Sequence, residues 1–344
     1  MNARLLFLAP LLVAFVPPLA LEEEILFAPS EGATFTVTYT NELEMSMADQ
    51  SVTLTINGEE NDQETPDFEL TLSQSFEATF QDTVVSSADG RVTKLSRTFE
   101  EIAQTRSQEA DTPDGAQSND ETGESDLAGT TVVFSWDDEE EGYTVAFGED
   151  EDGDEELLEE LEFDIYFAGM LPDSAVSVGD SWSPDISALT QINDPGGDLQ
   201  INWEDTPEED EDDDLGQQYE DNLDGTIDCK LAEIVDEDGA RVAIIELAVE
   251  ASTSSTKGDE IDNQGISGTI GEDVEITFDF TGVLRWNLDA GHAVALELGG
   301  DIAYTIDSSQ DLARESETFL MEMQRSFEGT NTMTCTIEAG SSEE

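Results

Sequence analysis

Hydrophobic residues recur at every second position along most of this chain, which is the pattern of β-strands that bury one face. The alternation begins near Thr34 and returns in short runs as far as Ile337. The clearest runs are Phe35–Tyr39, Val52–Ile56, Phe68–Leu72, Val274–Phe280, Val283–Leu288 and Val294–Leu298. We therefore predict roughly fourteen strands and a mainly β fold of large, curved antiparallel sheets. A half-barrel and a wrap of two sheets both fit this pattern.

Turn and helix signals separate the apolar runs. Asn57-Gly58, Asp89-Gly90 and Asp238-Gly239 are dipeptides typical of tight hairpin turns, and Gly299-Gly300 also predicts a turn. One to three short helices are expected, the best over Asp154–Leu161, with Asp154 as its cap. Two further candidates are Ile186–Ile192 and Asp311–Glu317. The hairpins favour antiparallel pairing over a series of β-α-β units.

Two polar, acidic stretches divide the chain. Residues 107–126 lack periodicity, and we predict a disordered insertion there. Residues 204–222 form a second acidic segment, the predicted linker between two β-rich halves over 28–203 and 223–339. Residues 340–344 form a short tail.

The first 20 residues resemble a secretory signal peptide. Arg4 precedes an apolar run over Leu5–Val16, and Ala20 suits the position before a cleavage site. No later apolar stretch reaches the ~18 residues that a membrane helix needs. We therefore expect an exported protein of the periplasm, the cell envelope or the extracellular space.

The charge of the chain is extreme, with 84 acidic and 11 basic residues, one histidine and a formal net charge of −73. Such a surface repels nucleic acid and anionic membranes, because both are bound by neutralising phosphates with lysine and arginine. Salt screens this self-repulsion. Arg91, Lys94 and Arg97 form the only basic cluster, which we expect to pair locally with acidic residues.

Two cysteines, Cys229 and Cys335, each lie in an alternating, strand-like run. In an oxidising compartment they could form a disulfide, closing a loop of about 100 residues and stabilising the fold by up to ~4.7 kcal/mol. The alternative is two separate buried thiols. The spacing does not predict a metal site, since no C-x-x-C motif accompanies it.

One pair of motifs suggests catalysis. Gly179-Asp180-Ser181 matches the G-D-S element of GDSL-type esterases, and Asp289-Ala290-Gly291-His292 matches their later D-x-x-H element. A triad of Ser181, His292 and Asp289 is therefore an alternative hypothesis. Against it, those enzymes have parallel sheets, and Asp289–His292 reads here as a hairpin turn.

Acidic clusters raise a second alternative, weak binding of Ca²⁺. Asp150, Asp152 and Asp154 have the alternate spacing of an EF-hand loop, with Glu155 in place of its glycine. Glu220, Asn222 and Asp224 match other positions of such a loop, but Leu231 stands where its bidentate glutamate belongs. Both are near matches, so a divalent-cation-binding surface protein is an alternative, and no other cofactor is predicted.

Several short motifs resemble an uncharacterised family of exported, β-rich bacterial proteins. They are Leu171-Pro172 with Val176-Ser177-Val178-Gly179-Asp180-Ser181-Trp182, Asp89-Gly90-Arg91 with Arg97-Thr98-Phe99, Pro195–Leu199, and the hairpin Gly282–Gly299. The resemblance implies a secreted β-rich domain without assigned catalytic residues. It also implies that Gly179-Asp180-Ser181 is a strand-end turn before a buried tryptophan.

No coherent catalytic set emerges from these motifs. We therefore expect a non-enzymatic, exported β-sheet protein that binds an apolar ligand or an envelope partner, with a concave apolar sheet face as the natural ligand site.

Overall fold

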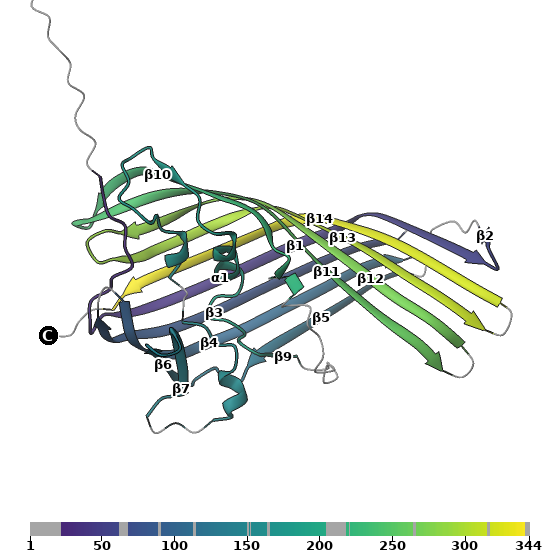
Figure 1. Ribbon diagram of the computed structural model, residues 1–344, viewed down its shortest axis with the longest axis horizontal. Helices are drawn as coiled ribbons and strands as arrows, with labels where there is room; N and C mark the ends of the chain where they lie inside the picture. Colours follow the sequence, from purple (N-terminus) through teal and green to yellow (C-terminus); the bar gives the residue numbers. More distant parts are fainter. Residues whose placement is uncertain are drawn as a thin grey trace, which may run out of the picture.

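The computed structural model describes residues 22–61, 68–88, 91–112, 115–149, 151, 153–163, 166–203, 218–219, 221–263, 266–314 and 317–340. These residues form one antiparallel sheet of 14 strands (Figure 1). The main path of the sheet is β7-β6-β4-β3-β1-β14-β13-β12-β11-β10-β8, with β2 beside β1 and β5 between β4 and β9.

The strands are unusually long. Their bounds are β1 Thr34–Ile56, β2 Glu59–Asn61, β3 Glu69–Ala88, β4 Arg91–Thr112, β5 Gly115–Ser125, β6 Thr131–Asp137, β7 Gly142–Phe147, β8 Ser181–Trp182, β9 Ile201–Trp203, β10 Asp224–Glu237, β11 Ala240–Asn263, β12 Ile266–Asn287, β13 His292–Arg314 and β14 Glu317–Ala339. Seven of them have 20 to 24 residues, where a typical strand has about 5 or 6.

The predicted fold class is confirmed: the protein is mainly β, antiparallel and not closed into a barrel. Of the half-barrel and the wrap of two sheets, the single open sheet corresponds to the half-barrel. The two predicted halves meet inside this sheet, because β1 pairs with β14 from Phe35 opposite Ala339 to Ile56 opposite Phe319. The predicted signal peptide and almost all of the linker over 204–222 lie outside the described residues.

The prediction of a disordered insertion over residues 107–126 is wrong. Most of this stretch forms the end of β4 and all of β5, paired from Ala103 opposite Glu124 to Thr112 opposite Gly115. The prediction of a helix over Asp311–Glu317 is also wrong, since β13 and β14 continue through most of it. Polar residues hold these strands because backbone groups pair and threonine and serine side chains hydrogen-bond across them, as in Ser75 with Thr105 (2.8 Å).

Gly299-Gly300 is a mid-strand feature, contrary to the predicted turn. Both residues lie inside β13, with Gly300 opposite Phe280 on β12. A Cβ atom on Gly300 would lie 2.1 Å from the carbonyl oxygen of Asp279, so only glycine permits this approach of the two strands. By contrast, Asn57-Gly58 and Asp238-Gly239 are turns as predicted, with positive φ at all four residues.

The helical elements that can be described in full are short. A 3₁₀ turn over Glu155–Leu158 follows Asp154, whose side chain accepts a hydrogen bond from the backbone N–H of Glu156, as predicted for a cap. A second lies at Ala168–Met170. A third, Ile186–Leu189, runs into the helix α1, Thr190–Asn193, at the predicted place.

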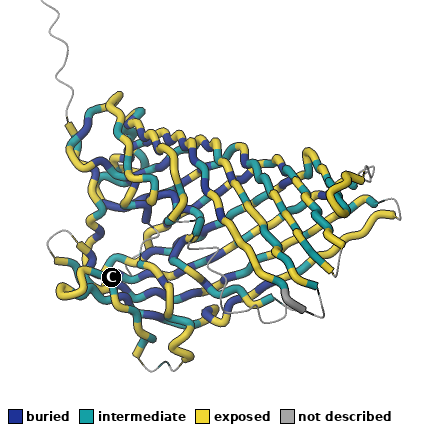
Figure 2. Tube along the Cα trace, turned by 45° about the vertical axis from the view of Figure 1, so that its right-hand side comes forward, coloured by how far each residue is buried: buried dark blue, intermediate teal, exposed yellow. Residues whose placement is uncertain are grey.

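The two faces of the sheet differ. We call the face that carries Tyr39, Phe80 and Trp286 the inner face. The described residues of the stretch 148–203, which we call the covering segment, lie over it at one end of the sheet (Figure 1). Tyr39 donates a hydrogen bond to the carbonyl oxygen of Ile192 in this segment (2.5 Å). Figure 2 shows the result, with buried residues gathered at the covered end and alternating exposed and intermediate residues along the opposite, open end.

A buried ion pair fastens the covering segment to the sheet. Arg97 on β4 lies opposite Asp82 on β3, and their side chains form two hydrogen bonds of 3.0 Å at 0% exposure. Arg97 also donates to the carbonyl oxygens of Glu162 (3.2 Å) and Phe163 (3.1 Å), and the hydroxyl of Tyr166 donates to Asp82 (2.6 Å). The guanidinium faces the rings of Phe80 and Phe134, at 5.2 and 5.1 Å. Strands and cover are thus joined through one charge pair.

Replacing Asp82 with alanine should therefore destabilise the fold strongly. The substitution leaves the buried guanidinium of Arg97 without its counter-charge, which costs about 3–5 kcal/mol. Urea unfolding followed by tryptophan fluorescence measures this loss. The matched control is Glu246→Ala, which removes the exposed partner of Lys230 and should cost under ~1 kcal/mol. Equal effects of both substitutions would contradict the role given to the buried pair.

Candidate functional site

The segment that contains Ser181 is a corner between the covering segment and the sheet. Gly179 has φ 98° and donates its backbone N–H to the carbonyl oxygen of Leu231 (2.7 Å). The carboxylate of Asp180 accepts a hydrogen bond from the backbone N–H of Ser177 (2.8 Å), as in a turn. Ser181 is exposed and pairs with Lys230 on β10. The next residue, Trp182, donates its indole N–H to the carbonyl oxygen of Met170 (2.9 Å) and so anchors the corner.

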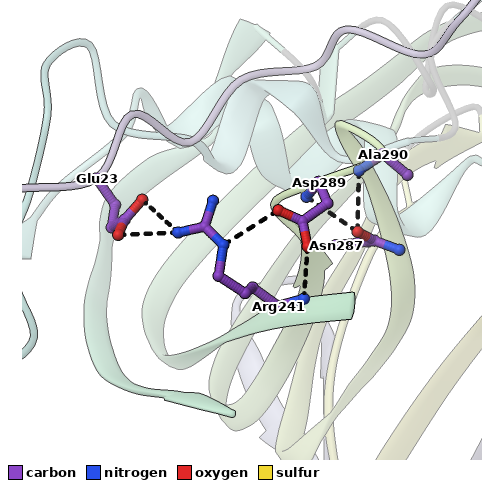
Figure 3. Close-up of polar contacts among 5 residues, drawn as sticks. All are labelled: Glu23, Arg241, Asn287, Asp289 and Ala290. Carbon is purple, nitrogen blue, oxygen red and sulfur yellow. Dashed lines mark hydrogen bonds and ion pairs between the residues drawn. The ribbon is translucent and has the colours of Figure 1, made fainter. Parts of the chain in front are cut away.

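Asp289 and His292, the other members of the suggested triad, are engaged elsewhere. Figure 3 shows Asp289 held by Arg241, which donates from its backbone (2.9 Å) and from Nε (3.1 Å) and also binds Glu23. These contacts, the backbone hydrogen bond first, lower the pKa of Asp289. His292 Nδ1 is hydrogen-bonded to the carbonyl oxygen of Ala293 (2.6 Å), and its ring centroid lies 4.7 Å from that of Phe35. Burial lowers the pKa of His292, which favours the neutral ring.

The structure does not bring the three side chains of the suggested triad together. Ser181 lies on β8 and His292 on β13, with β10, β11 and β12 between them. Four strand spacings of about 4.8 Å amount to roughly 19 Å, far beyond hydrogen-bond reach. This arrangement cannot activate the hydroxyl of Ser181 through His292.

The two cysteines are separate, free and buried. Cys229 lies on β10 and Cys335 on β14, again four strand spacings apart, whereas a disulfide needs Cα atoms within about 7 Å. Burial raises the pKa of each thiol to about 12. Of the two alternatives drawn from the sequence, the pair of buried thiols holds and the disulfide does not.

The candidate calcium ligands do not converge in the part of the chain that can be described. Asp150, Asp152 and Glu220 lie outside it. Asp154 caps a 3₁₀ turn, Asn222 donates to the carbonyl oxygen of Ser254 (2.8 Å), and Asp224 begins β10. Within the described ranges no group of three or more acidic, histidine or cysteine side chains is arranged to hold a metal ion.

The inner face of the open end of the sheet is the remaining candidate site. There the far ends of β1, β12, β13 and β14 extend beyond the covering segment (Figure 1). Their inward-pointing side chains are mostly apolar and only partly buried. We call ten of them the open strip: Val52, Leu54 and Ile56 on β1, Ile270 and Val274 on β12, Ile306 and Leu312 on β13, and Phe319, Met321 and Met323 on β14.

The register pairs many of these side chains with one another on neighbouring strands. Leu54 lies opposite Met321, and Val52 lies opposite Met323. Leu312 lies opposite Phe319, and Ile306 lies opposite Val274. Because residues two apart share a face, the open strip continues the buried core of the covered end on β12, β13 and β14. On β1 a bulge between Met47 and Asp49 shifts the alternation, so Val52, Leu54 and Ile56 lie on the same face as Tyr39. Apart from Gly271 and Leu320, the outward positions between them carry threonine, serine, aspartate and glutamate.

Polar side chains interrupt the apolar surface at two places. Glu272 on β12 and Ser308 and Gln310 on β13 lie on the inner face among the residues of the open strip, and Ser308 donates a hydrogen bond to Glu272 (3.2 Å). Two further polar side chains stand at the covered end of the strip. Gln50 on β1 and Arg325 on β14 lie opposite each other, two residues before Val52 and two after Met323. Gln50 Nε2 contacts the sulfur of Met323 at 3.9 Å. Gln50 Oε1 and Arg325 Nε are both buried atoms without a hydrogen-bond partner among the described residues. Sequence reasoning did not single out either residue, although an arginine within an alternating apolar run (Phe319–Phe327) was a usable signal.

The outer face carries two shallow hollows, of about 420 and 540 Å³, over β14, β1, β3, β4 and β5. Their lining includes Glu44, Ser73, Ser107 and Thr330. Polar and acidic walls of this kind do not suit an apolar ligand. The open strip, on the opposite face, therefore fits the expected binding site better.

Comparisons with known proteins add little. No protein-family model matches the chain, and no curated protein matches it. An outer-membrane channel of Pseudomonas putida F1 aligns with 12% identity over 90% of this chain and 97% of its own, at a TM-score of 0.20. The secretin β-barrel of InvG from the Salmonella SPI-1 injectisome aligns with 7% identity over 92% and 65%, at a TM-score of 0.16. None of the helices in the described part of the chain is long and apolar enough to cross a membrane.

The thiols should be inert while the protein is folded. Their burial and raised pKa values keep both in the unreactive, protonated form at pH 8. We expect no reaction of the native protein with dithionitrobenzoate, and release of two thiol equivalents per chain on unfolding without reductant. If the unfolded, unreduced chain releases none, the cysteines are disulfide-bonded and the present assignment is wrong.

Proposed function

We propose that this is an exported binding protein of the cell envelope or its surroundings, and that the open strip takes the hydrocarbon part of an apolar ligand. The main observation behind this proposal is that apolar residues continue along the inner face from the covered core to the uncovered end of the sheet. The signal-like N-terminus supports export. The proposal is non-enzymatic, in keeping with the separation of Ser181 from His292.

The energetics favour a hydrocarbon ligand at this face. Partly exposed aliphatic and aromatic side chains gain about 25 cal/mol for each Å² of apolar surface that a ligand removes from water. Each buried methylene of the ligand contributes about 0.8 kcal/mol on the same scale. Methionines such as Met321 and Met323 adapt their shape to flexible chains. A contiguous apolar surface of this kind marks a binding site more often than a random surface does.

The polar surroundings restrict what can bind there. The chain carries 84 acidic residues against 11 basic ones, so the protein repels anionic membranes and stays dispersed. A single ligand molecule can reach the open strip from solution, so no charged membrane surface has to approach the acidic protein. We therefore propose capture of individual apolar molecules, with no docking onto a bilayer.

A charge placed on the open strip should abolish binding of a neutral apolar probe. In Met321→Glu the new carboxylate lies between Leu54 and Gln310, where it must be desolvated when a ligand binds. We expect the affinity for a neutral naphthylamine dye, followed by its fluorescence increase, to fall at least about tenfold, the equivalent of ~1.4 kcal/mol. The matched control is Gln324→Glu, which adds the same charge to the outer face of the same strand and should bind like the parent.

Two outcomes would overturn this function. One is the absence of saturable dye binding to the parent protein. The other is concentration-dependent self-association that Met321→Glu removes, measured by sedimentation, which would make a second copy of the chain the occupant of the open strip. If Met321→Glu and Gln324→Glu bind the dye equally well, the binding site does not lie on the inner face.

A further inference from the structure

We propose that the ligand of the open strip is a long-chain fatty acid, and that Arg325 pairs with its carboxylate while the alkyl chain lies along β1 and β14. The inference rests on the proposed function and adds the chemical class of the ligand. The observation behind it is that the guanidinium of Arg325 has no ion-pair partner among the described residues and lies at one end of the open strip.

The position of Arg325 sets it apart from ordinary surface arginines. Its side chain is half-buried and projects from the inner face of β14 between Met323 and Phe327. The residues opposite it are Gln50 on β1 and Ile306 on β13. None of these four neighbours carries a charge. Glu272 lies on the same face in the next row, two strands away on β12, where it accepts a hydrogen bond from Ser308 (3.2 Å).

Five other basic residues in the described part of the chain have carboxylate partners, whereas Arg91, Lys94 and Arg314, which form no ion pair with a described residue, are exposed to solvent. Arg97 pairs with Asp82, Arg106 with Glu121, Lys230 with Glu246, Arg241 with Glu23 and Asp289, and Arg285 with Glu237. With 84 acidic residues in the chain, a carboxylate could have stood beside almost any arginine. Within the described residues Arg325 forms no ion pair, and its Nε is buried without a hydrogen-bond partner.

An unpaired, partly desolvated charge is unfavourable in the free protein, and a ligand carboxylate relieves that penalty. Gln50 is neutral and cannot supply the missing charge, although its unpartnered Oε1 can accept one N–H of Arg325. The guanidinium presents five donors in a planar fork, which matches a carboxylate in a bidentate arrangement. The free protein therefore contains half of an ion pair that the ligand completes.

The distance from Arg325 to the tip of the open strip suits a single alkyl chain. From Arg325 to Phe319 is six residues along β14, about 20 Å at 3.4 Å per residue. Each leaflet of a bilayer, and hence one acyl chain, spans about 15 Å of hydrocarbon. A chain anchored at Arg325 would thus lie over the rows of Met323, Met321 and Phe319 and end within the strip.

The test compares oleate with oleyl alcohol, which has the same chain and no charge, on the full-length protein at 0.15 M salt. There the Debye length is about 8 Å, so the distant acidic residues are largely screened. Isothermal titration should give the parent at least a tenfold preference for oleate. Arg325→Met should lose this preference by weakening oleate binding at least tenfold while leaving oleyl alcohol binding unchanged. Arg325→Lys should keep part of the preference.

Lys94→Met is the control, because it removes one positive charge from an exposed position on the outer side of β4. It should leave both affinities unchanged. Thermal unfolding separates binding from structure: loss of an unpaired charge should leave the melting temperature of Arg325→Met equal to or above that of the parent. A lower melting temperature would mean that Arg325 is structural and would overturn the proposal.

The remaining outcomes separate this inference from the function on which it rests. If neither oleate nor oleyl alcohol binds the parent, the proposed function itself fails. If both bind equally to the parent and to Arg325→Met, the open strip binds hydrocarbon but Arg325 does not select a carboxylate. If Lys94→Met weakens oleate as much as Arg325→Met, the effect is one of net charge and the specific pair is refuted.

Discussion

The buried pair of Arg97 and Asp82 is the charged contact that ties the covering segment to one end of the sheet. It joins β3 to β4 and, through Glu162, Phe163 and Tyr166, holds the covering segment on the inner face. A charge pair of this kind is costly to desolvate and tolerable only with all its hydrogen bonds in place. Here the backbone carbonyl oxygens and the tyrosine hydroxyl supply them. The cover lies at this end of strands that extend well beyond it (Figure 1).

That placement of the cover explains the asymmetry of the molecule. At the covered end, rows of inner-face side chains such as Tyr39, Phe80 and Trp286 are buried completely. Further along the same strands the rows remain apolar but lose their cover, from Val52 to Ile56 on β1 and from Met323 to Phe319 on β14. In a sheet with a purely structural role, we would expect polar residues at these uncovered inner-face positions, as on the outer face. The persistence of methionine, leucine and isoleucine is what a binding role accounts for.

The alternation of apolar residues predicted the antiparallel sheet, and short-range turn chemistry predicted hairpins at Asn57-Gly58 and Asp238-Gly239. The local pairing expected for the basic cluster holds for Arg97, whose partner is 15 residues away. Strand lengths could not be predicted, because β5 and the ends of β11 and β13 are held by backbone pairing and hydroxyl contacts, which leave no apolar period in the sequence. The role of Gly300 could not be predicted either. A Gly-Gly dipeptide is found both in turns and where two strands approach closely, and the sequence does not distinguish the two.

The sequence predicted the type of candidate site but not its location. A concave apolar face was expected, but its location depends on where the covering segment stops, and this is a tertiary property. The motif around Ser181 illustrates the converse case. Its residues match a catalytic pattern, yet Gly179 and Asp180 serve a turn that sets Trp182 in place, and Asp289 is bound to Arg241. Short motifs carry no information about which distant residue stands beside them.

Photo-crosslinking would test the central claim most directly. A fatty acid with a diazirine near its methyl end, bound to the full-length protein and irradiated, labels the residues that surround the chain. The account predicts adducts on inward-facing residues at the tip of the strip, such as Leu54 and Met321, with none on their outward-facing neighbours Thr55 and Leu320. Labelling of Thr55 and Leu320, or scattered labelling of both faces, would contradict it.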